Sequence, residues 1–369
     1  MLYEFLPDWL LIALAGLLAF VISYFFVPPV KRFAESVGAV DQPGARRIHD
    51  HPIPRMGGMA IVLAFMISMI LFVKVTEPVG GLMIGALMIA IMGALDDIYD
   101  LNPWLKLAVQ IGAALVAISQ GVVLNGITNP FQDSTYGFTL SLGENIGAFL
   151  TLGWLIVCTN AINLIDGLDG LAVGLTAIGA TTMLIVSLMV ADVNVTVILA
   201  CLLGSCIGFM PYNLNPAKIF MGDVGAQTLG FILGAASTLG LFKLHALITF
   251  LVPIMALAVP LADTAYAFFR RILKGQSPFK ADKGHFHHKL LALGLSQKQV
   301  VAILYSITGI MGLISILMTE SDAILKIVCT VLVFLIAVCI WIFVISKIPT
   351  HKYSETEPDV KIYDKGDNK

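Results

Sequence analysis

Long apolar runs separated by short polar segments dominate this chain of 369 residues. A helix that crosses a bilayer needs about 20 apolar residues, and the runs predict eleven such helices, with ten as the alternative count. We expect them at residues 9–27, 57–73, 79–95, 104–122, 146–164, 170–190, 194–212, 225–241, 245–268, 299–318 and 323–346. The pattern therefore predicts an all-α integral membrane protein, with one polytopic helix bundle over residues 1–350 and a polar, disordered tail over residues 351–369.

The composition supports this fold class. Hydrophobic residues make up 58% of the chain, charged residues make up 12%, and the mean hydropathy is +0.91. Soluble proteins carry about 25% charged residues, so an ordinary soluble protein is excluded and no nucleic-acid partner is expected. The five cysteines lie inside apolar runs without CxxC spacing, which indicates buried thiols rather than disulfides or metal ligands.

Basic residues are distributed unevenly between the two predicted sides of the membrane. With eleven spans, 19 of the 22 Lys and Arg residues fall on one side and 3 on the other. Because basic residues concentrate on the cytoplasmic side, we expect an external N-terminus, a cytoplasmic tail, and cytoplasmic loops at residues 28–56 and 269–298. The first run has no basic residue before it and no cleavage site after it, so it should be retained as a span.

Carboxylates and amides gather at the predicted cytoplasmic helix ends. The segment NAINLIDGLDG offers Asn160, Asn163, Asp166 and Asp169 at three-residue intervals between two apolar runs. Polar groups at such positions are usually functional, because placing them in lipid is costly. Asp166, Asp169 and the more distant Asp223 could instead be helix N-caps.

Asp96 and Asp97 need another explanation. They end a span that runs toward the cytoplasm, and the helix dipole disfavours carboxylates at that end. A cation or a cationic side chain between them would offset the repulsion. Mg²⁺ is the natural ion, with Mn²⁺ as an alternative, because it takes oxygen ligands and shares them with substrate phosphates.

Basic side chains occupy the two long cytoplasmic loops. His285, His287 and His288 lie in one loop, and Arg46 and Arg55 lie in the other. Clustered imidazole and ammonium groups suit phosphate oxygens. For the histidines, a membrane-surface loop and a zinc site are the alternatives, and for the arginines a positive-inside anchor is the alternative.

An acidic centre with basic surroundings at the bilayer edge is typical of a Mg²⁺-assisted phosphoryl-transfer site. The acceptor would be a membrane lipid, since the predicted site opens at the edge of the bilayer. The chain has no GxxxxGK[ST] loop and no GxGxxG turn, so a nucleotide would be held in another way.

Six stretches across most of the chain carry a specific resemblance. They are PRMGG (54–58), LDDIYDL (95–101), NAINLIDGLDGLAVG (160–174), NPAKIFMGDVGA (215–226), VPLADT (259–264) and HFHHKLLALGLS (285–296). In this order they resemble the motifs of the polyprenyl-phosphate N-acetylhexosamine-1-phosphate transferase family. The HFHH loop, the VPLADT segment and the third acid of LDDIYD are more similar to its GlcNAc-1-phosphate branch than to its peptidoglycan translocases.

The resemblance implies an activity and a location. The protein would transfer GlcNAc-1-phosphate from UDP-GlcNAc to undecaprenyl phosphate and release UMP, as the first step of a cell-envelope glycopolymer such as wall teichoic acid. It would lie in the bacterial cytoplasmic membrane with its active site on the cytoplasmic face. The resemblance also allows a homodimer.

The resemblance further implies roles for individual residues. Asp223 and Asn163 would belong to the Mg²⁺ site, and Asp169 would lie where the family binds the uracil ring. The three histidines would hold the sugar-pyrophosphate, and the remaining expected substrate-binding residues are Asn160, Asp166, Arg46 and Arg55.

Asp96 and Asp97 match the paired acids of the family, for which proton removal and covalent attack are both considered. A phosphate monoester has a second pKa of about 6 and is already largely ionised near neutrality. We therefore expect direct attack by the lipid phosphate. Asp96 would complete its deprotonation or orient it, and Asp97 would support that region.

Three alternatives stay open. The donor could be UDP-MurNAc-pentapeptide or another UDP-amino sugar. The protein could be a secondary transporter with broken helices, although transporter sites lie near the bilayer midplane between repeated halves, and the acids here lie at one edge. It could also be an inactive homologue that serves as a binding scaffold, although the motif acids and histidines are all in place.

Overall fold

The computed structural model describes residues 6–43, 51–124, 126–128, 139–141, 143–190, 193–240, 247–273 and 286–319. These residues contain twelve helices: α1 Asp8–Ser36, α2 Gly58–Phe72, α3 Glu77–Tyr99, α4 Pro103–Ser119, α5 Gly143–Ile165, α6 Leu171–Val190, α7 Val193–Asn213, α8 Gly222–Gly240, α9 Leu247–Ala256, α10 Ala258–Leu273, α11 Phe286–Ala292 and α12 Gln297–Met318. Two antiparallel ribbons complete the fold, β1 Val40–Asp41 with β2 Ile53–Pro54, and β3 Gly126–Thr128 with β4 Thr139–Ser141.

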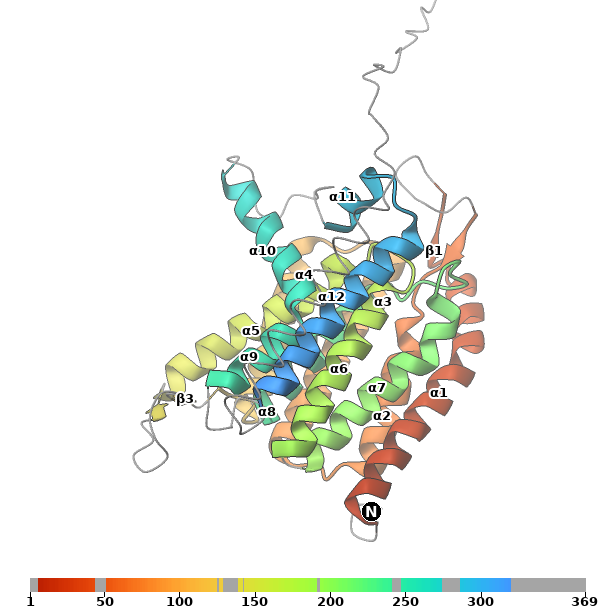
Figure 1. Cartoon of the computed structure of the whole chain (residues 1–369). Helices are drawn as coiled ribbons and strands as arrows, with labels where there is room; N and C mark the ends of the chain where they lie inside the picture. Colours follow the sequence, from red (N-terminus) through yellow and green to blue (C-terminus); the bar gives the residue numbers. More distant parts are fainter. Residues whose placement is uncertain are drawn as a thin grey trace, which may run out of the picture.

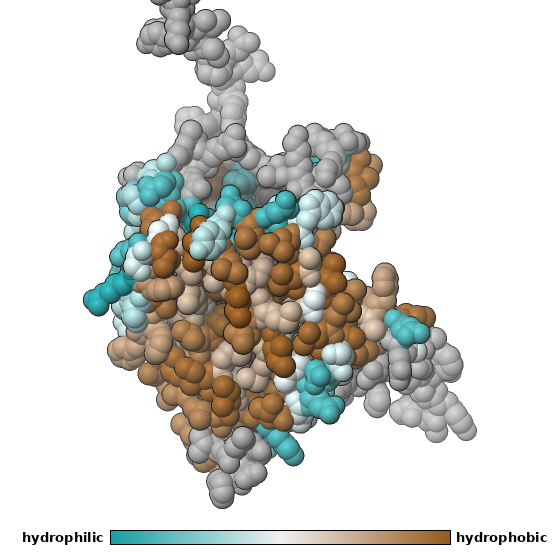
Figure 2. Space-filling view, turned by 180° about the vertical axis from the view of Figure 1, so that it is seen from behind, coloured by the Kyte–Doolittle hydropathy of each residue, from teal (hydrophilic) through white to brown (hydrophobic). Residues whose placement is uncertain are grey.

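The helices form a bundle with an apolar surface. In the described part of the chain, six helices are long and apolar enough to cross a membrane, namely α1, α3, α5, α6, α7 and α12, and the apolar α2 and α4 are shorter. Apolar side chains cover the body of the molecule, whereas hydrophilic ones gather toward its upper end (Figure 2). The prediction of a polytopic membrane helix bundle is confirmed. The number of spans and their orientation stay predictions, and the expected span 323–346 lies outside the described residues.

Helix α8 occupies the centre of the bundle, and its residues from Val224 to Gly240 are all buried. Small residues let its neighbours approach closely, as is common between membrane helices. A side chain at Gly93 of α3 would meet the backbone of Val224, and one at Gly230 of α8 would meet the backbone of Cys158 in α5. This close packing fixes the ends of α3 and α5 relative to the start of α8.

Three boundaries differ from those expected. Helix α1 continues through Pro28 and Pro29 to Ser36, so the predicted loop start at residue 28 is wrong. A proline inside a helix loses the hydrogen bond of its own nitrogen and crowds the carbonyl one turn earlier. The buried Val30 and Ala34 hold the last turns in place despite this cost. The expected span 245–268 is divided into α9 and α10, and the loop expected at residues 269–298 contains α11 and the start of α12.

The two ends of the bundle are chemically different. The start of α1 lies at one end, and β1 and α11 lie at the opposite end (Figure 1). The last turn of α3 and the connections after α5 and α7 meet at the end where β1 and α11 lie, because residues from all three line one cavity. The acidic motifs, far apart in the sequence, therefore converge as predicted.

Candidate active site

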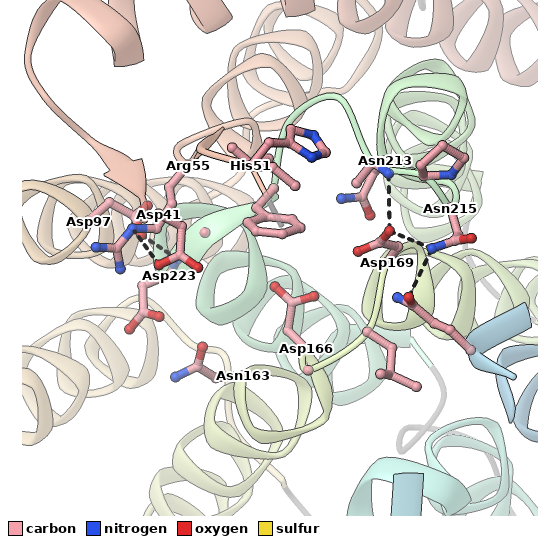
Figure 3. Close-up of a pocket in the computed structure, with 18 of the residues that line it drawn as sticks. Asp41, His51, Arg55, Asp97, Asn163, Asp166, Asp169, Asn213, Asn215 and Asp223 are labelled. Carbon is pink, nitrogen blue, oxygen red and sulfur yellow. Dashed lines mark hydrogen bonds and ion pairs between the residues drawn. The ribbon is translucent and has the colours of Figure 1, made fainter. Parts of the chain in front are cut away.

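A polar cavity of about 500 Å³ opens at this end of the bundle. Its charged and amide side chains come from the ends of six helices (α3, α5, α7, α8, α11 and α12), from the connections after α5 and α7, and from the β1–β2 ribbon with the residues beside it. Figure 3 shows how they surround the cavity. These lining side chains include Arg55, Asp97, Asn163, Asp166, Asp169, Asn213, Asn215, Asp223, His288 and Gln297.

Asp97 joins the end of α3 to the start of α8. Its Oδ1 atom accepts a hydrogen bond from the backbone N–H of Asp223 (3.0 Å), and its Oδ2 atom accepts one from Val224 (3.2 Å). The first N–H groups of a helix have no partner within that helix and attract negative charge. Asp97, which is 3% exposed, therefore caps α8 from another helix.

Gly222 makes this cap possible. Its φ of +72° is a conformation that glycine adopts easily, and a Cβ atom there would collide with the Asp97 carboxylate. The sequence GDVG thus provides a sharp backbone turn into α8, with Asp223 in its first turn.

Lys106 supplies a cation to Asp96, one member of the predicted acidic pair, but its second partner is Asp223 and not Asp97. Its ammonium group donates to Oδ2 of Asp96 and, at 3.2 Å, to Oδ2 of Asp223. Oδ1 of Asp96 accepts the backbone N–H of Leu101 at 2.8 Å. Both oxygens of the buried Asp96 are therefore engaged.

A tight turn between α3 and α4 brings Lys106 back to Asp96. Asp100 ends α3 in the left-handed region with a φ of 55°. The Asn102 side chain then accepts the N–H of Trp104 at the start of α4, and Pro103 occupies the first turn, where its missing N–H costs nothing. Lys106 consequently lies one turn into α4, on the side of the carboxylates.

The PRMGG segment pairs with the strand-like segment before α8. Phe220 donates its N–H to Pro54, Gly57 donates to Phe220, and Gly58 donates to Met221, all at 2.8–2.9 Å. A Cβ atom on Gly57 would lie 2.7 Å from the carbonyl oxygen of Phe220. The two glycines are therefore needed for this pairing, which places Arg55 on the cavity wall.

Asp169 anchors the DGLDG loop to the connection between α7 and α8. Its Oδ2 atom accepts hydrogen bonds from the Asn215 amide (2.9 Å) and from the N–H of Ala217 (3.0 Å), as Figure 3 shows. Asn215 also donates to Gln297 at 2.8 Å, and the neighbouring Gly170 donates its N–H to Asn213 at 3.1 Å. Asp169 thus bonds a segment more than forty residues away in the sequence, so the N-cap alternative does not account for it.

Asp166 points into the cavity between Asn163 and Asp169 (Figure 3). Burial raises the pKa of its carboxyl group from the ordinary value of 3.8 to about 8, and the nearby carboxylates of Asp223, Asp97 and Asp169 add to this shift. A carboxylate crowded by like charges favours a proton or a cation. Asp166 therefore marks the part of the cavity where a positive ligand group is most favoured.

His287 and His288 enter the site from α11. The buried His287 packs on Gly167 so closely that a Cβ atom there would lie 2.5 Å from its Nε2 atom. The centroid of its ring lies 4.3 Å from the centroid of the His288 ring. His288 lines the cavity. The start of α11 is held by Asp263, whose Oδ1 accepts the N–H of Phe286 at 2.7 Å.

The other predicted site residues lie in different places. Asn160 is one turn deeper than Asn163 on α5 and bonds Gln110, so neither Asn160 nor Asp96 is among the described cavity-lining residues. Arg46 and His285 lie outside the described residues. The site roles of Lys106, Asn215 and Gln297 are not visible in the sequence, because only the reverse turn and the loop packing bring these residues to the acids.

The donor set of the cavity suits a hard metal ion that is shared with a substrate. In the described residues no three His, Cys, Asp or Glu side chains group as ligands for one metal, and His285, one of the three histidines of the zinc alternative, lies outside those residues. The carboxylates of Asp223 and Asp166 and the amide of Asn163 face the same space (Figure 3). Mg²⁺ is usually held by one or two carboxylates, with substrate phosphates and waters as the other ligands, so the residues present fit it.

Comparison with known proteins identifies the family. Residues 79–241 match the family model described as Glycosyl transferase family 4. The probable undecaprenyl-phosphate N-acetylglucosaminyl 1-phosphate transferase of Bacillus subtilis is 39% identical over 308 residues, which cover 82% of this chain and 85% of that protein. The chain belongs to glycosyl transferase family 4. The family predicted from the six motifs is thereby confirmed.

Two further relatives show which branch of family 4 this chain resembles more. The decaprenyl-phosphate N-acetylglucosaminephosphotransferase of Mycobacterium tuberculosis is 37% identical over 330 residues, covering 82% of this chain and 81% of that protein. The phospho-N-acetylmuramoyl-pentapeptide-transferase of Staphylococcus aureus is 28% identical over 317 residues, covering 82% of this chain and 96% of that protein. The N-acetylglucosamine relatives are the more similar ones, as the motif comparison predicted.

Proposed function

We propose that this protein transfers GlcNAc-1-phosphate from UDP-GlcNAc to undecaprenyl phosphate, giving GlcNAc-pyrophosphoryl-undecaprenol and UMP. The observation that carries the proposal is the Lys106 ammonium group shared by Asp96 and Asp223 beside a polar cavity at one end of an apolar bundle. A phosphoryl-transfer site needs such fixed charges. The named activity of the Bacillus subtilis relative supports the choice of donor and acceptor.

In the proposed reaction an oxygen of the lipid phosphate attacks the β-phosphorus of UDP-GlcNAc. A new P–O bond forms to the lipid phosphate, the bond between the β-phosphorus and the bridging oxygen breaks, and that oxygen leaves with UMP. Charge develops on the phosphoryl oxygens during this exchange. In this proposal Lys106 stabilises that charge and orients the lipid phosphate.

Asp96 and Asp97 act in this proposal by positioning other groups. Asp96 holds Lys106, and Asp97 holds the first turn of α8, which carries Asp223. Because each carboxylate already accepts two hydrogen bonds, the arrangement supports direct attack by the lipid phosphate over a covalent aspartyl intermediate.

Asp223, Asn163 and Asp166 would hold Mg²⁺. When bound, the ion would neutralise the pyrophosphate and activate its β-phosphorus.

Asp169 receives both described hydrogen bonds at Oδ2, so we assign its Oδ1 atom to the uracil ring. His288 and Arg55 line the cavity on other sides and would contact the sugar-pyrophosphate. We further propose that this end of the bundle faces the cytoplasm of a bacterium, where nucleotide sugars are made.

Purified protein in detergent, with undecaprenyl phosphate and Mg²⁺, tests the proposal. Three donors are compared, UDP-GlcNAc, UDP-GalNAc and UDP-MurNAc-pentapeptide, and both UMP and the lipid product are measured. We expect product with UDP-GlcNAc, and we expect EDTA or Asp223→Ala to abolish it. Glu77→Gln, an exposed acid at the far end of α3, is the matched control and should stay active. Folded protein that forms no lipid product from any donor would contradict the transferase function. Lipid product from UDP-GalNAc alone or from UDP-MurNAc-pentapeptide alone would assign the protein to the branch of the family that uses that donor.

A further inference from the structure

A chain of amide side chains, two of them buried and one half-buried, runs from Asp223 through α8 and α4 to α5. Gln227, one turn along α8, donates to Oδ2 of Asp223 at 2.7 Å. Gln110 of α4 donates to Oε1 of Gln227 at 2.8 Å, and Asn160 of α5 donates to Oε1 of Gln110 at 2.8 Å. Gln227 is fully buried and Gln110 is 3% exposed. We refer to Gln227, Gln110 and Asn160 as the amide relay.

The carboxylate sets the direction of every bond in the relay. An ionised carboxylate only accepts hydrogen bonds, so Gln227 must present its NH₂ group to Asp223 and its carbonyl oxygen to Gln110. Gln110 must then present its NH₂ group to Gln227 and its carbonyl oxygen to the NH₂ group of Asn160. An amide turned the other way would leave buried donors or acceptors unpaired, which is costly within a bilayer.

The relay connects the two sides of the cavity where a metal would bind. Asp223 lies on α8, and Asn163 lies one turn from Asn160 on α5. Gln110 lies one turn from Lys106 on α4, and Lys106 donates to the same oxygen of Asp223 as Gln227 does. Three helices are thus held around one carboxylate oxygen, and the Oδ1 atom of Asp223 receives neither of these two bonds.

From this geometry we infer that Gln227 and Gln110 are positioning residues for the metal-binding carboxylate. Their hydrogen bonds fix the rotation of the Asp223 carboxylate so that Oδ1 is presented to the cation, and they set the distance between Asp223 and Asn163. Partners behind a metal ligand commonly change metal affinity about 10- to 100-fold when they are removed. The inference rests on the proposed function, because that function assigns the cation to Asp223.

The test measures metal binding as well as catalysis. Mn²⁺ is titrated into the full-length protein in detergent, and free Mn²⁺ is followed by electron paramagnetic resonance. Gln227→Met keeps the length of the side chain but removes its donor. We expect its dissociation constant for Mn²⁺ to rise about tenfold, with a parallel rise in the Mg²⁺ concentration for half-maximal transfer. Gln110→Met should act in the same direction and more weakly, because Gln227 keeps its bond to Asp223.

The matched control is Thr228→Val. Thr228 is fully buried beside Gln227 and donates only within its own helix, to the Val224 carbonyl at 2.7 Å. Its substitution changes the packing of the same helix without touching the relay. We expect the control to bind Mn²⁺ and respond to Mg²⁺ as the wild type does.

A double variant separates positioning from simple stabilisation. Removing both partners of a buried hydrogen bond is often nearly neutral for stability, whereas removing one leaves the other unpaired. Gln110→Met combined with Gln227→Met should therefore recover most of the Tm lost by Gln227→Met and still bind Mn²⁺ weakly. Recovery of Mn²⁺ binding together with Tm would show a purely structural role and overturn the inference.

The outcomes distinguish this inference from the function on which it rests. A folded wild type that transfers no sugar phosphate and binds no Mn²⁺ overturns both. An active wild type whose Gln227→Met variant binds Mn²⁺ as tightly as the Thr228→Val control overturns the amide relay alone.

Discussion

At the scale of single residues, Lys106 shares one ammonium group between the carboxylates of Asp96 and Asp223. We expect Lys106→Met to lower kcat for GlcNAc-1-phosphate transfer by about 10²- to 10³-fold, the usual effect of removing one charge-stabilising group. The KM for UDP-GlcNAc should change little, because the assigned uracil and sugar contacts lie elsewhere in the cavity. Lys74→Met, an exposed lysine between α2 and α3, is the control, and initial rates measure both. Activity of Lys106→Met within twofold of the wild type would exclude this role.

Asp166 makes the stability of the metal-free protein depend on pH. The folded protein raises its pKa from 3.8 to about 8, so the folded state binds the proton more tightly than the unfolded state does. Its contribution to stability is fully present below about pH 4 and is lost as the pH rises through about 8. In EDTA we therefore expect Tm to fall between about pH 4 and about pH 8, and we expect Asp166→Asn to flatten that fall. Thermal unfolding in detergent measures Tm across this pH range. The control is Asp8→Asn, which changes an exposed acid. An equal slope in both variants would show that Asp166 is not the titrating group.

At the scale of helices, the junction of α3 and α8 depends on Gly222. Gly222→Ala would push a methyl group into the Asp97 carboxylate and force alanine into a positive φ. We expect a loss of about 1–3 kcal/mol in stability, seen as a lower Tm, together with loss of transfer. Gly153→Ala on α5 is the control, since nothing lies within 4 Å of its added Cβ atom. If both variants unfold at the wild-type temperature, Asp97 does not hold the start of α8 as described.

At the scale of the whole molecule, the predicted orientation can be tested in intact cells. Asp8 and Lys298 are exposed and lie at opposite ends of the bundle, because Asp8 begins α1 at the N-terminal end and Lys298 begins α12 beside the cavity. An external N-terminus predicts that Asp8→Cys reacts with a membrane-impermeant maleimide, whereas Lys298→Cys reacts only after the cells are permeabilised. The wild type, with its five cysteines in apolar runs, gives the background. The reverse labelling would place the site outside the cytoplasm.

The sequence alone determined the membrane class, the approximate position of ten helical runs and the motifs that converge at the site. It could do so because lipid requires long apolar helices with internally paired backbones, and this requirement is visible in local composition. Asp166, Asp169 and Asp223 were found as site candidates for the same reason, since a carboxylate beside an apolar run stands out.

The tertiary structure decided which partners those residues have. The cap that Asp97 gives to α8 joins residues 126 positions apart, and the Lys106 bond to Asp223 and the Gln110 bond to Gln227 each span 117 positions. The continuation of α1 through two prolines also depends on packing against neighbouring helices. Local composition shows that a polar group must be satisfied, but only the packing of helix ends determines which group satisfies it.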